Sequence, residues 1–289
     1  MIVPAQLKIF KNFLYLAWKH LHLPPPTKIQ YDMADFLQYG PKRSCVQAFR
    51  GAGKSWITSA FACWNWLMDP QKNILVVSAS KTRADDFSTF TQRLIHELPI
   101  LAHLKPRDDQ RSSKVSFDVG PARASHAPSC KSMGITSQLT GSRADLIIAD
   151  DVESANNSQT QLMRDRLSET IKEFDSIIKP EIGRILFLGT PQTELSIYNQ
   201  LEERGFKTQI WPARFPDAKA ITNYGRKLAT SIIENADKLK AGDALDPKRF
   251  DDVDLMEREA SYGRSGFSLQ FMLDTTLSDV NKYPLKLND

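Results

Sequence analysis

Short, continuous apolar segments alternate along this chain with longer segments whose apolar residues recur every three or four positions. The first pattern is typical of strands buried on both faces of a sheet, and the second of helices that bury one face. Their alternation predicts an α/β fold, with a mostly parallel sheet flanked by helices. The expected strands are 44–49, 74–78, 114–119, 146–149, 184–188 and 208–211, and the expected helices are 29–38, 54–67, 81–98, 160–178 and 194–203.

The pattern changes after Trp211. Every expected strand lies within residues 1–214, which begin with an amphipathic extension, residues 1–26, that ends in three prolines. Residues 215–289 are polar, with helical periodicity at 223–240 and 251–262. We therefore expect a core domain over 1–214 and a small helical subdomain over 215–289, of which 279–289 resemble a linker.

The most informative motif is Ala-Phe-Arg-Gly-Ala-Gly-Lys-Ser at 48–55, between an expected strand and an expected helix. It has the spacing of a phosphate-binding loop, in which glycines let backbone N–H groups face a phosphate chain at a helix N-terminus. In such a loop the lysine reaches the β- and γ-phosphates and the serine hydroxyl ligates Mg²⁺. The alternative is a glycine-rich turn that binds nothing. The predicted ATP-binding residues are Gly51, Ala52, Gly53, Lys54 and Ser55.

An acidic motif follows the expected strand 146–149. Asp150 is placed to hold Mg²⁺, and a second acid would polarise the attacking water. The order here is Asp-Asp-Val-Glu, so Asp151 has the right position with a shorter reach, whereas Glu153 has the right length two residues later. Both remain candidates for the general base, and position favours Asp151.

Four further side chains are candidates for the same site. Arg143 ends a loop that contains Gly and Ser, and it could stabilise γ-phosphate charge in its own subunit or in a neighbouring one. Thr190 and Gln192 follow the strand 184–188, where they could sense the γ-phosphate or the attacking water. Gln30 begins a helix, and its amide could recognise the edge of adenine. A solvated or salt-bridged arginine is the structural alternative for Arg143, and an ordinary turn is the alternative for Thr190 and Gln192.

Composition changes this picture little. The chain has 289 residues, 41% of them hydrophobic and 25% charged, as in ordinary globular proteins. A net charge of +4 permits contact with nucleic acid without demonstrating it. The three separated cysteines suit a reducing compartment and form no metal motif. No apolar segment reaches the length of a membrane span. Lys81 and Arg83 suit either a phosphate backbone or the solvated start of a helix.

The motifs together resemble the ATPase half of a bacteriophage large terminase subunit. The resemblance rests on Gln30, the phosphate loop with Arg50, the strand end at 147–151 and Leu-Gly-Thr-Pro-Gln at 188–192. Residues 138–153 and 267–274 are similar to the podovirus branch of the family. The resemblance implies an ASCE-type P-loop ATPase fold with a small linker subdomain, and it makes Arg50 a nucleotide-binding residue and Arg143 a candidate finger acting in trans.

The resemblance also implies a DNA-packaging motor, in which ATP hydrolysis drives double-stranded DNA through a portal into a procapsid in the host cytoplasm. The implied partners are double-stranded DNA, the portal protein, a small terminase subunit and further copies in a ring, and no membrane. A nuclease domain follows the ATPase in this family, and we expect no nuclease activity from residues 1–289. The alternatives are a superfamily 2-like helicase fragment and a nucleotide-gated DNA-binding assembly module without turnover.

Overall fold

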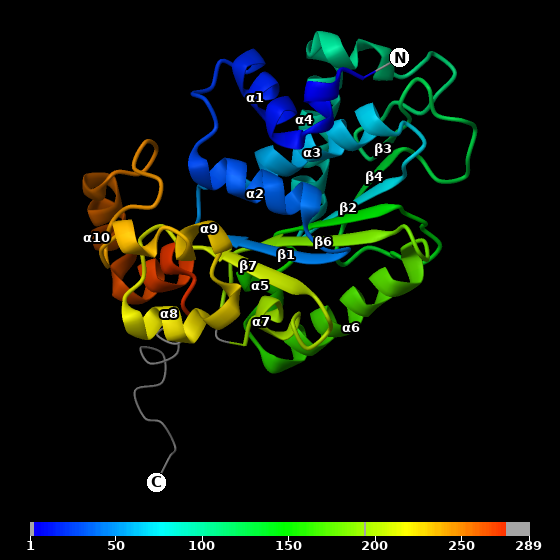
Figure 1. Ribbon diagram of the computed structural model, residues 1–289. Helices are drawn as coiled ribbons and strands as arrows, with labels where there is room; N and C mark the ends of the chain where they lie inside the picture. Colours follow the sequence, from blue (N-terminus) through cyan, green and yellow to red (C-terminus); the bar gives the residue numbers. More distant parts are fainter. Residues whose placement is uncertain (1–2, 194, 276–289) are drawn as a thin grey trace.

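Residues 3–193 and 195–275 are described by a computed structural model, and they contain a seven-stranded sheet with helices on both faces (Figure 1). The strands are β1 Arg43–Ala48, β2 Ile74–Ser78, β3 Ser116–Phe117, β4 Cys130–Gly134, β5 Leu146–Asp150, β6 Arg184–Gly189 and β7 Lys207–Trp211. Their order is β3-β4-β2-β5-β6-β1-β7, and of these neighbouring pairs β3 with β4 is antiparallel and the rest are parallel. The predicted α/β fold is confirmed.

Two layers of helices bury the sheet. Helices α1 Phe10–His20, α2 Lys28–Tyr39, α3 Lys54–Met68 and α4 Lys81–Glu97 lie on one side, and α5 Ala155–Ser158, α6 Gln161–Ile177 and α7 Ile197–Gln200 lie on the other (Figure 1). The 3₁₀ turns η1 Ala5–Lys8 and η2 Pro99–Leu104 flank the first layer. Among the described residues, no helix has the length and apolar content that a membrane crossing requires.

The strands are apolar throughout because their two faces enter two different hydrophobic clusters. In β5, Ile148 packs into the cluster under α1–α4, whereas Ile147 and Ala149 pack into the cluster under α6 and α7. Side chains alternate between the faces of a strand, so a strand covered on both sides shows no polar alternation. The continuous apolar segments of the sequence are the direct result.

Three sequence expectations were wrong in detail. Strand β4 was missed, because Lys131 and Met133 are only partly buried and its residue types do not favour a strand. The expected strand 114–119 shrinks to Ser116–Phe117, an edge strand that pairs with β4 alone. The expected helix 194–203 reduces to α7, and residue 194 lies outside the described residues.

The segment after β7 is helical and gathers at one end of the sheet (Figure 1). It contains α8 Ala218–Tyr224, η3 Gly225–Lys227, α9 Thr230–Ile233, η4 Ala236–Lys238, α10 Asp252–Phe267 and the π-helical turn η5 Ser268–Met272. The expected continuous helix 223–240 was wrong, because Gly225 has a φ of +55° and ends α8. The expected helix 251–262 is confirmed as part of α10.

This C-terminal segment shares the core of the rest of the protein. Its buried side chains, which include Leu228, Phe250 and Phe271, belong to the hydrophobic cluster under α1–α4. The ring of Phe250 meets that of Phe49 edge to face, with centroids 5.2 Å apart. We expected the residues after about 215 to pack as a separate unit. The described residues of this segment, up to residue 275, instead pack into the core of the rest of the protein. The boundary at 215 stays a prediction, and the expected linker 279–289 lies outside the described residues.

The N-terminal helix packs on the domain, as its amphipathic pattern predicts. Phe10 is fully buried, and its ring lies 5.0 Å from that of Phe61 and 5.6 Å from that of Trp64, both on α3. The Trp64 indole N–H donates to the carbonyl of Leu7 at 2.8 Å, which ties the preceding turn to the same helix. This aromatic contact fixes α1 beside the helix that follows the phosphate loop.

We predict that Phe10→Ala destabilises the protein by about 3–5 kcal/mol, the usual range for removing a fully buried aromatic ring. Urea unfolding followed by circular dichroism measures this change. Tyr15→Ala is the matched control, because Tyr15 lies on the same helix and is 46% exposed. The control is expected to change stability by less than about 0.5 kcal/mol, and equal losses from both variants would contradict the assignment.

Candidate nucleotide-binding site

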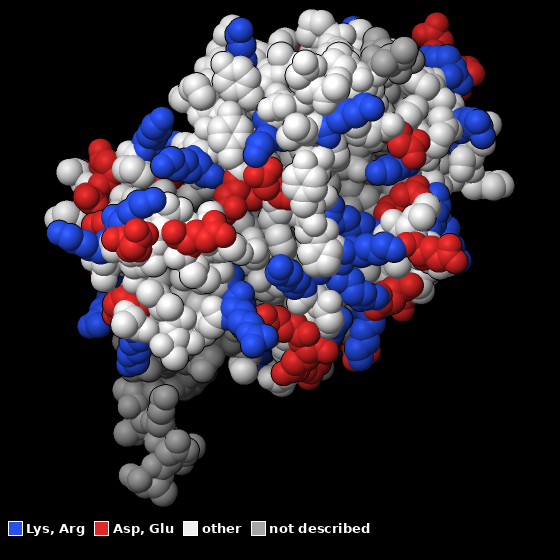
Figure 2. Space-filling model, viewed as in Figure 1, with Lys and Arg blue, Asp and Glu red and all other residues white. Residues whose placement is uncertain are grey.

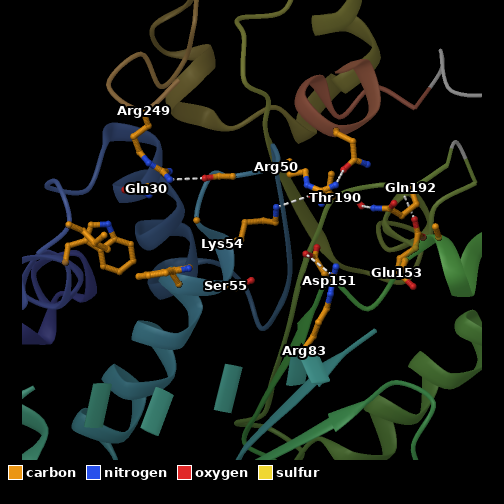
Figure 3. Close-up of a pocket in the computed structure, with 18 of the residues that line it drawn as sticks. Gln30, Arg50, Lys54, Ser55, Arg83, Asp151, Glu153, Thr190, Gln192 and Arg249 are labelled. Carbon is orange, nitrogen blue, oxygen red and sulfur yellow. Dashed lines mark hydrogen bonds and ion pairs between the residues drawn. The ribbon is translucent and has the colours of Figure 1, made fainter. Parts of the chain in front are cut away.

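A cavity of about 770 Å³ opens at the edge of the sheet where the parallel strands end. Ligands of open α/β sheets bind at this edge, because loops and helix N-termini converge there. Most of the residues that the sequence singled out line it (Figure 3). They are Gln30, Arg50, Gly51, Gly53, Lys54, Ser55, Asp151, Glu153, Thr190 and Gln192.

The phosphate loop turns sharply from β1 into α3. Gly51 and Gly53 have φ angles of +93° and +92°, a left-handed conformation that other residues rarely adopt. A Cβ on Gly51 would also lie 2.7 Å from the ring of Phe250. Ala52 is fully buried beneath the turn. The N-terminus of the 15-residue helix α3 faces the cavity, where its partial positive charge favours an anion.

Lys54 joins the phosphate loop to the end of β6. Its ammonium donates to the carbonyl of Ala48 at 2.8 Å and to the Thr190 hydroxyl at 3.0 Å. The Thr190 hydroxyl in turn donates to the same Ala48 carbonyl at 3.3 Å. Burial lowers the pKa of Lys54, and the charges of Asp151 and Asp150 oppose that shift. The arrangement keeps a cation at the floor of the cavity with neutral oxygens as its direct partners.

Ser55 and Asp150 form a pair of oxygen ligands beside that cation. The Ser55 hydroxyl donates to a carboxylate oxygen of Asp150 at 3.1 Å. Burial and the charge of Asp151 raise the pKa of Asp150 to about 7. Mg²⁺ prefers such hard oxygens and usually takes only one or two protein ligands beside phosphates and water. The pair therefore fits Mg²⁺, although the described residues contain no cluster of three His, Cys, Asp or Glu side chains that could hold a metal alone.

The two candidate bases occupy different environments. Asp151 lines the cavity, with its side chain about one third exposed and a carboxylate oxygen 3.9 Å from the Arg83 guanidinium. Its φ of +46° is unusual for a non-glycine residue, and such strain costs on the order of 1–3 kcal/mol. The strained backbone is held by a hydrogen bond from the Asp151 N–H to the Leu188 carbonyl at 2.9 Å. The carboxylate of Asp151 has both access to the cavity and a cationic neighbour.

The carboxylate of Glu153 instead accepts hydrogen bonds from the loop after β6. One carboxylate oxygen accepts from the backbone N–H of Gln192 at 2.8 Å. The other accepts from the Ser196 hydroxyl at 2.9 Å and from the backbone N–H of Ile197 at 2.7 Å. Only 2% of Glu153 is exposed, and burial raises its pKa, which these hydrogen bonds oppose. This carboxylate orders the loop that carries Thr190, and it has little freedom to approach a water molecule.

Gln192 and Gln30 both use their amides within the protein. The Gln192 side chain donates to the carbonyl of Thr190 at 3.0 Å. Gln30 accepts from the Thr27 N–H at 3.2 Å, as part of the capping box of α2, and donates to the Ala52 carbonyl at 3.1 Å. Both side chains still line the cavity. The roles that the sequence suggested for them, sensing the phosphate and recognising adenine, stay predictions.

Arg143 lies far from this cavity. It precedes β5, whereas the site is at the end of β5, and its exposed side chain donates to the carbonyls of Ser142 and Ser176. Arg143 and Asp150 are seven residues apart on an extended chain, which separates them by about 20 Å. A role for Arg143 in the site of its own subunit is therefore wrong.

Several residues of the site were missed by sequence reasoning. Trp18 and Pro24 form part of an apolar wall beside Gln30. Arg249 enters from the C-terminal segment and donates to the carbonyls of Gly51 and Ala52, both at 3.0 Å. Nothing near these residues in the sequence marks them, because tertiary packing alone brings them here. Arg83 was considered for a phosphate backbone, and it faces this cavity.

Comparisons with known proteins agree with this geometry. Residues 47–178 match the family described as terminase large subunit, T4likevirus-type, N-terminal. The chain is 52% identical over 296 residues to the large terminase subunit of Enterobacteria phage T3, and the match covers 100% of this chain and 50% of that protein. The chain thus spans about half the length of this relative.

Two solved structures of the large terminase ATPase domain of Thermus phage P74-26 share the fold. A mutant of that domain matches with a TM-score of 0.54 at 15% identity, over 90% of this chain and 97% of that one. A second structure of the domain matches with a TM-score of 0.50 at 14% identity, with the same coverage. The 52% identity to the phage T3 protein and the family match over residues 47–178 place the chain in the family of phage large terminase subunits, which its sequence motifs resemble.

Proposed function

We propose that this chain hydrolyses ATP and is the motor portion of a terminase that moves double-stranded DNA into a procapsid. The observation that carries the proposal is that Lys54, Ser55 and Asp151 line one cavity beside the N-terminus of α3, with Asp150 hydrogen-bonded to Ser55. A lysine, a hydroxyl, a metal-holding carboxylate and a free carboxylate are what phosphoryl transfer to water requires. The names of the relatives support the same assignment.

The roles follow from the positions of the side chains. Lys54 would exchange its bonds to Ala48 and Thr190 for phosphate oxygens, because a charged acceptor binds an ammonium more strongly than a neutral one. Ser55 and Asp150 would hold Mg²⁺, which when bound neutralises phosphate charge. Asp151 would orient and deprotonate the attacking water, since Glu153 is fully engaged by three donors. Thr190 would lie beside the γ-phosphate.

The partners of the whole protein belong to the same proposal. The chain spans about half of its phage T3 relative, so DNA translocation, the portal, the small terminase subunit and assembly in the host cytoplasm are inferred from the family alone. Residues 215–289 would serve as the linker subdomain of the motor. We assign no nuclease activity to residues 1–289.

We further propose that Arg143 acts in the site of a neighbouring subunit. The edge of the sheet at which Arg143 lies also carries Lys42, Arg43, Lys179 and Lys207. In Figure 2 the densest group of Lys and Arg lies right of centre, on the side away from α8–α10. The nucleotide edge carries the candidate phosphate-binding cavity, so an arginine on the facing edge of a neighbouring subunit would meet the negative charge of bound phosphate. Head-to-tail contacts between such edges generate rings.

Lys54→Ala is expected to lower ATP turnover at least about 100-fold, because the phosphates lose a buried cation. Phosphate release, with and without double-stranded DNA, measures the effect and tests the proposed function itself. Lys11→Ala is the control, since Lys11 lies partly exposed on α1, outside the cavity, and pairs with Asp35. Normal turnover in Lys54→Ala would refute the phosphate-loop assignment.

Asp151→Asn and Glu153→Gln are expected to fail in different ways. Asp151→Asn removes the base, so turnover should fall at least about 100-fold while ATP affinity stays within about threefold. Glu153→Gln places an amide N–H against backbone donors, so it should cost about 1–3 kcal/mol of stability. Stopped-flow binding of a fluorescent ATP analogue, phosphate release and urea unfolding separate the two. Full turnover by Asp151→Asn would assign the base elsewhere.

Mixing two inactive variants tests the trans role of Arg143. Arg143→Ala should bind ATP yet lose turnover, because an arginine finger contributes roughly 10³–10⁵ in rate. A mixture with Lys54→Ala should regain activity, since each subunit supplies the group that the other lacks. The assay needs conditions under which sedimentation shows assembled subunits. Assembled mixtures that remain inactive would exclude a finger in trans.

A further inference from the structure

Besides Arg249, the C-terminal segment contributes a glutamine to the nucleotide cavity. Gln270 lies in the π-helical turn η5, is 8% exposed and lines the cavity. The carbonyl of Gln270 accepts from the backbone N–H of Arg50 at 2.9 Å. Its side-chain oxygen accepts from the Arg50 guanidinium at 3.4 Å, and its side-chain nitrogen donates to the carbonyl of Pro191 at 3.4 Å. One side chain thus contacts both loops that border the phosphate position.

Those two loops are the ones that Lys54 also joins. Arg50 belongs to the phosphate loop, and Pro191 lies between Thr190, which accepts from Lys54, and Gln192, which donates to Glu153. A change in the distance between the loops must therefore alter the contacts of Gln270. π-Helical turns are rare and are frequently found at functional sites, which agrees with a constrained position here.

Arg50 keeps its charge available for a phosphate. Within residues 3–193 and 195–275, its side chain donates to Gln270 and forms no ion pair. A neutral amide orients a guanidinium without neutralising it, whereas a carboxylate at the same place would compete with the phosphate for the charge. A glutamine at position 270 can therefore orient Arg50 into the cavity without neutralising its charge.

The turn that carries Gln270 is itself firmly seated. Phe271 is fully buried, stacks on Phe267 with ring centroids 5.0 Å apart and lies under the guanidinium of Arg258 at 5.9 Å. The backbone N–H of Ala213, just after β7, donates to the Phe271 carbonyl at 2.8 Å. Displacement of Gln270 would therefore be passed to α10 and to the end of β7, and not absorbed by a loose loop.

We propose that Gln270 is a positioning residue that aims Arg50 at the terminal phosphate and links the phosphate loop and the 190–192 loop to η5 and α10. The inference rests on the proposed ATPase function and adds to it a contact through which the nucleotide state reaches the C-terminal segment. Gln270 touches no reacting atom, and it acts through Arg50.

A double-mutant cycle tests this coupling. Gln270→Met keeps the length of the side chain and removes both polar groups, and it should lower turnover about 10- to 100-fold with ATP affinity nearly unchanged. Arg50→Ala should lower turnover at least as much. The double variant should match Arg50→Ala, because Gln270 has no effect without Arg50. Losses that multiply in the double variant would overturn the proposal.

Two further variants distinguish positioning from general loosening. Gln209→Met is the matched control, since Gln209 is also 8% exposed and also ties the core to the C-terminal segment, through Thr230 at 3.3 Å, outside the cavity. It should keep wild-type turnover, and an equal loss would overturn the proposal. Gln270→Glu should weaken ATP binding, because the new carboxylate competes with the phosphate for the charge of Arg50. An unchanged ATP affinity would contradict the proposal that Arg50 points at the phosphate.

Hydrogen exchange supplies a readout besides turnover. A non-hydrolysable ATP analogue should slow amide exchange over residues 268–272 in the wild type, because bound phosphate fixes Arg50 and thereby Gln270. Gln270→Met should abolish this response, and Gln209→Met should keep it. A response that persists in Gln270→Met would overturn the proposal. A wild type that binds the analogue but releases no phosphate from ATP would refute the proposed function alone, since the exchange response would still decide the role of Gln270.

Discussion

The buried ammonium of Lys54 is the constraint around which the site is arranged. A cation taken out of water must be surrounded by oxygens, and here the end of β1 and the end of β6 supply them through Ala48 and Thr190. This requirement draws the phosphate loop and the loop after β6 together. It also leaves the cation with neutral partners, so that a phosphate can displace them. The ammonium of Lys54 therefore gives the floor of the cavity a positive charge.

The three carboxylates of the acidic motif differ in their burial and in their hydrogen-bond partners. Asp150 is beside Ser55 and Asp151 faces the cavity, whereas Glu153, which also lines the cavity, accepts three hydrogen bonds from the loop after β6. The strained backbone at Asp151 makes this division possible, because the turn there sends successive carboxylates in different directions. Three acids in four positions are thus a proposed metal ligand, a candidate base and a structural anchor.

The C-terminal segment is part of the site and not an appendage to it. Arg249 holds the carbonyls of the phosphate loop, Phe250 fills the space that a side chain at residue 51 would need, and Gln270 contacts Arg50. A loop that must respond to bound phosphate is thereby in contact with the last described helices. In the motor that we propose, such contacts would pass a change at the nucleotide to the C-terminal segment.

The sequence by itself determined the fold class and the chemistry of the phosphate end. Strand periodicity, the glycines at 51 and 53 and the acids that end β5 are local signals, because backbone conformation and the alternation of side chains are set by neighbouring residues. The same signals missed β4, whose partly polar residues are held in the sheet by β2 and β3. They also left Asp151 and Glu153 undecided.

Only the tertiary structure showed that the Glu153 carboxylate is engaged by three donors, that Arg143 lies at the opposite edge of the sheet and that Trp18, Arg249 and Gln270 line the cavity. Each of these facts depends on contacts between segments far apart in the chain; Gln270, for example, meets Arg50 across 220 residues. Such contacts follow from the packing of the two hydrophobic clusters, and no local pattern around these residues encodes them.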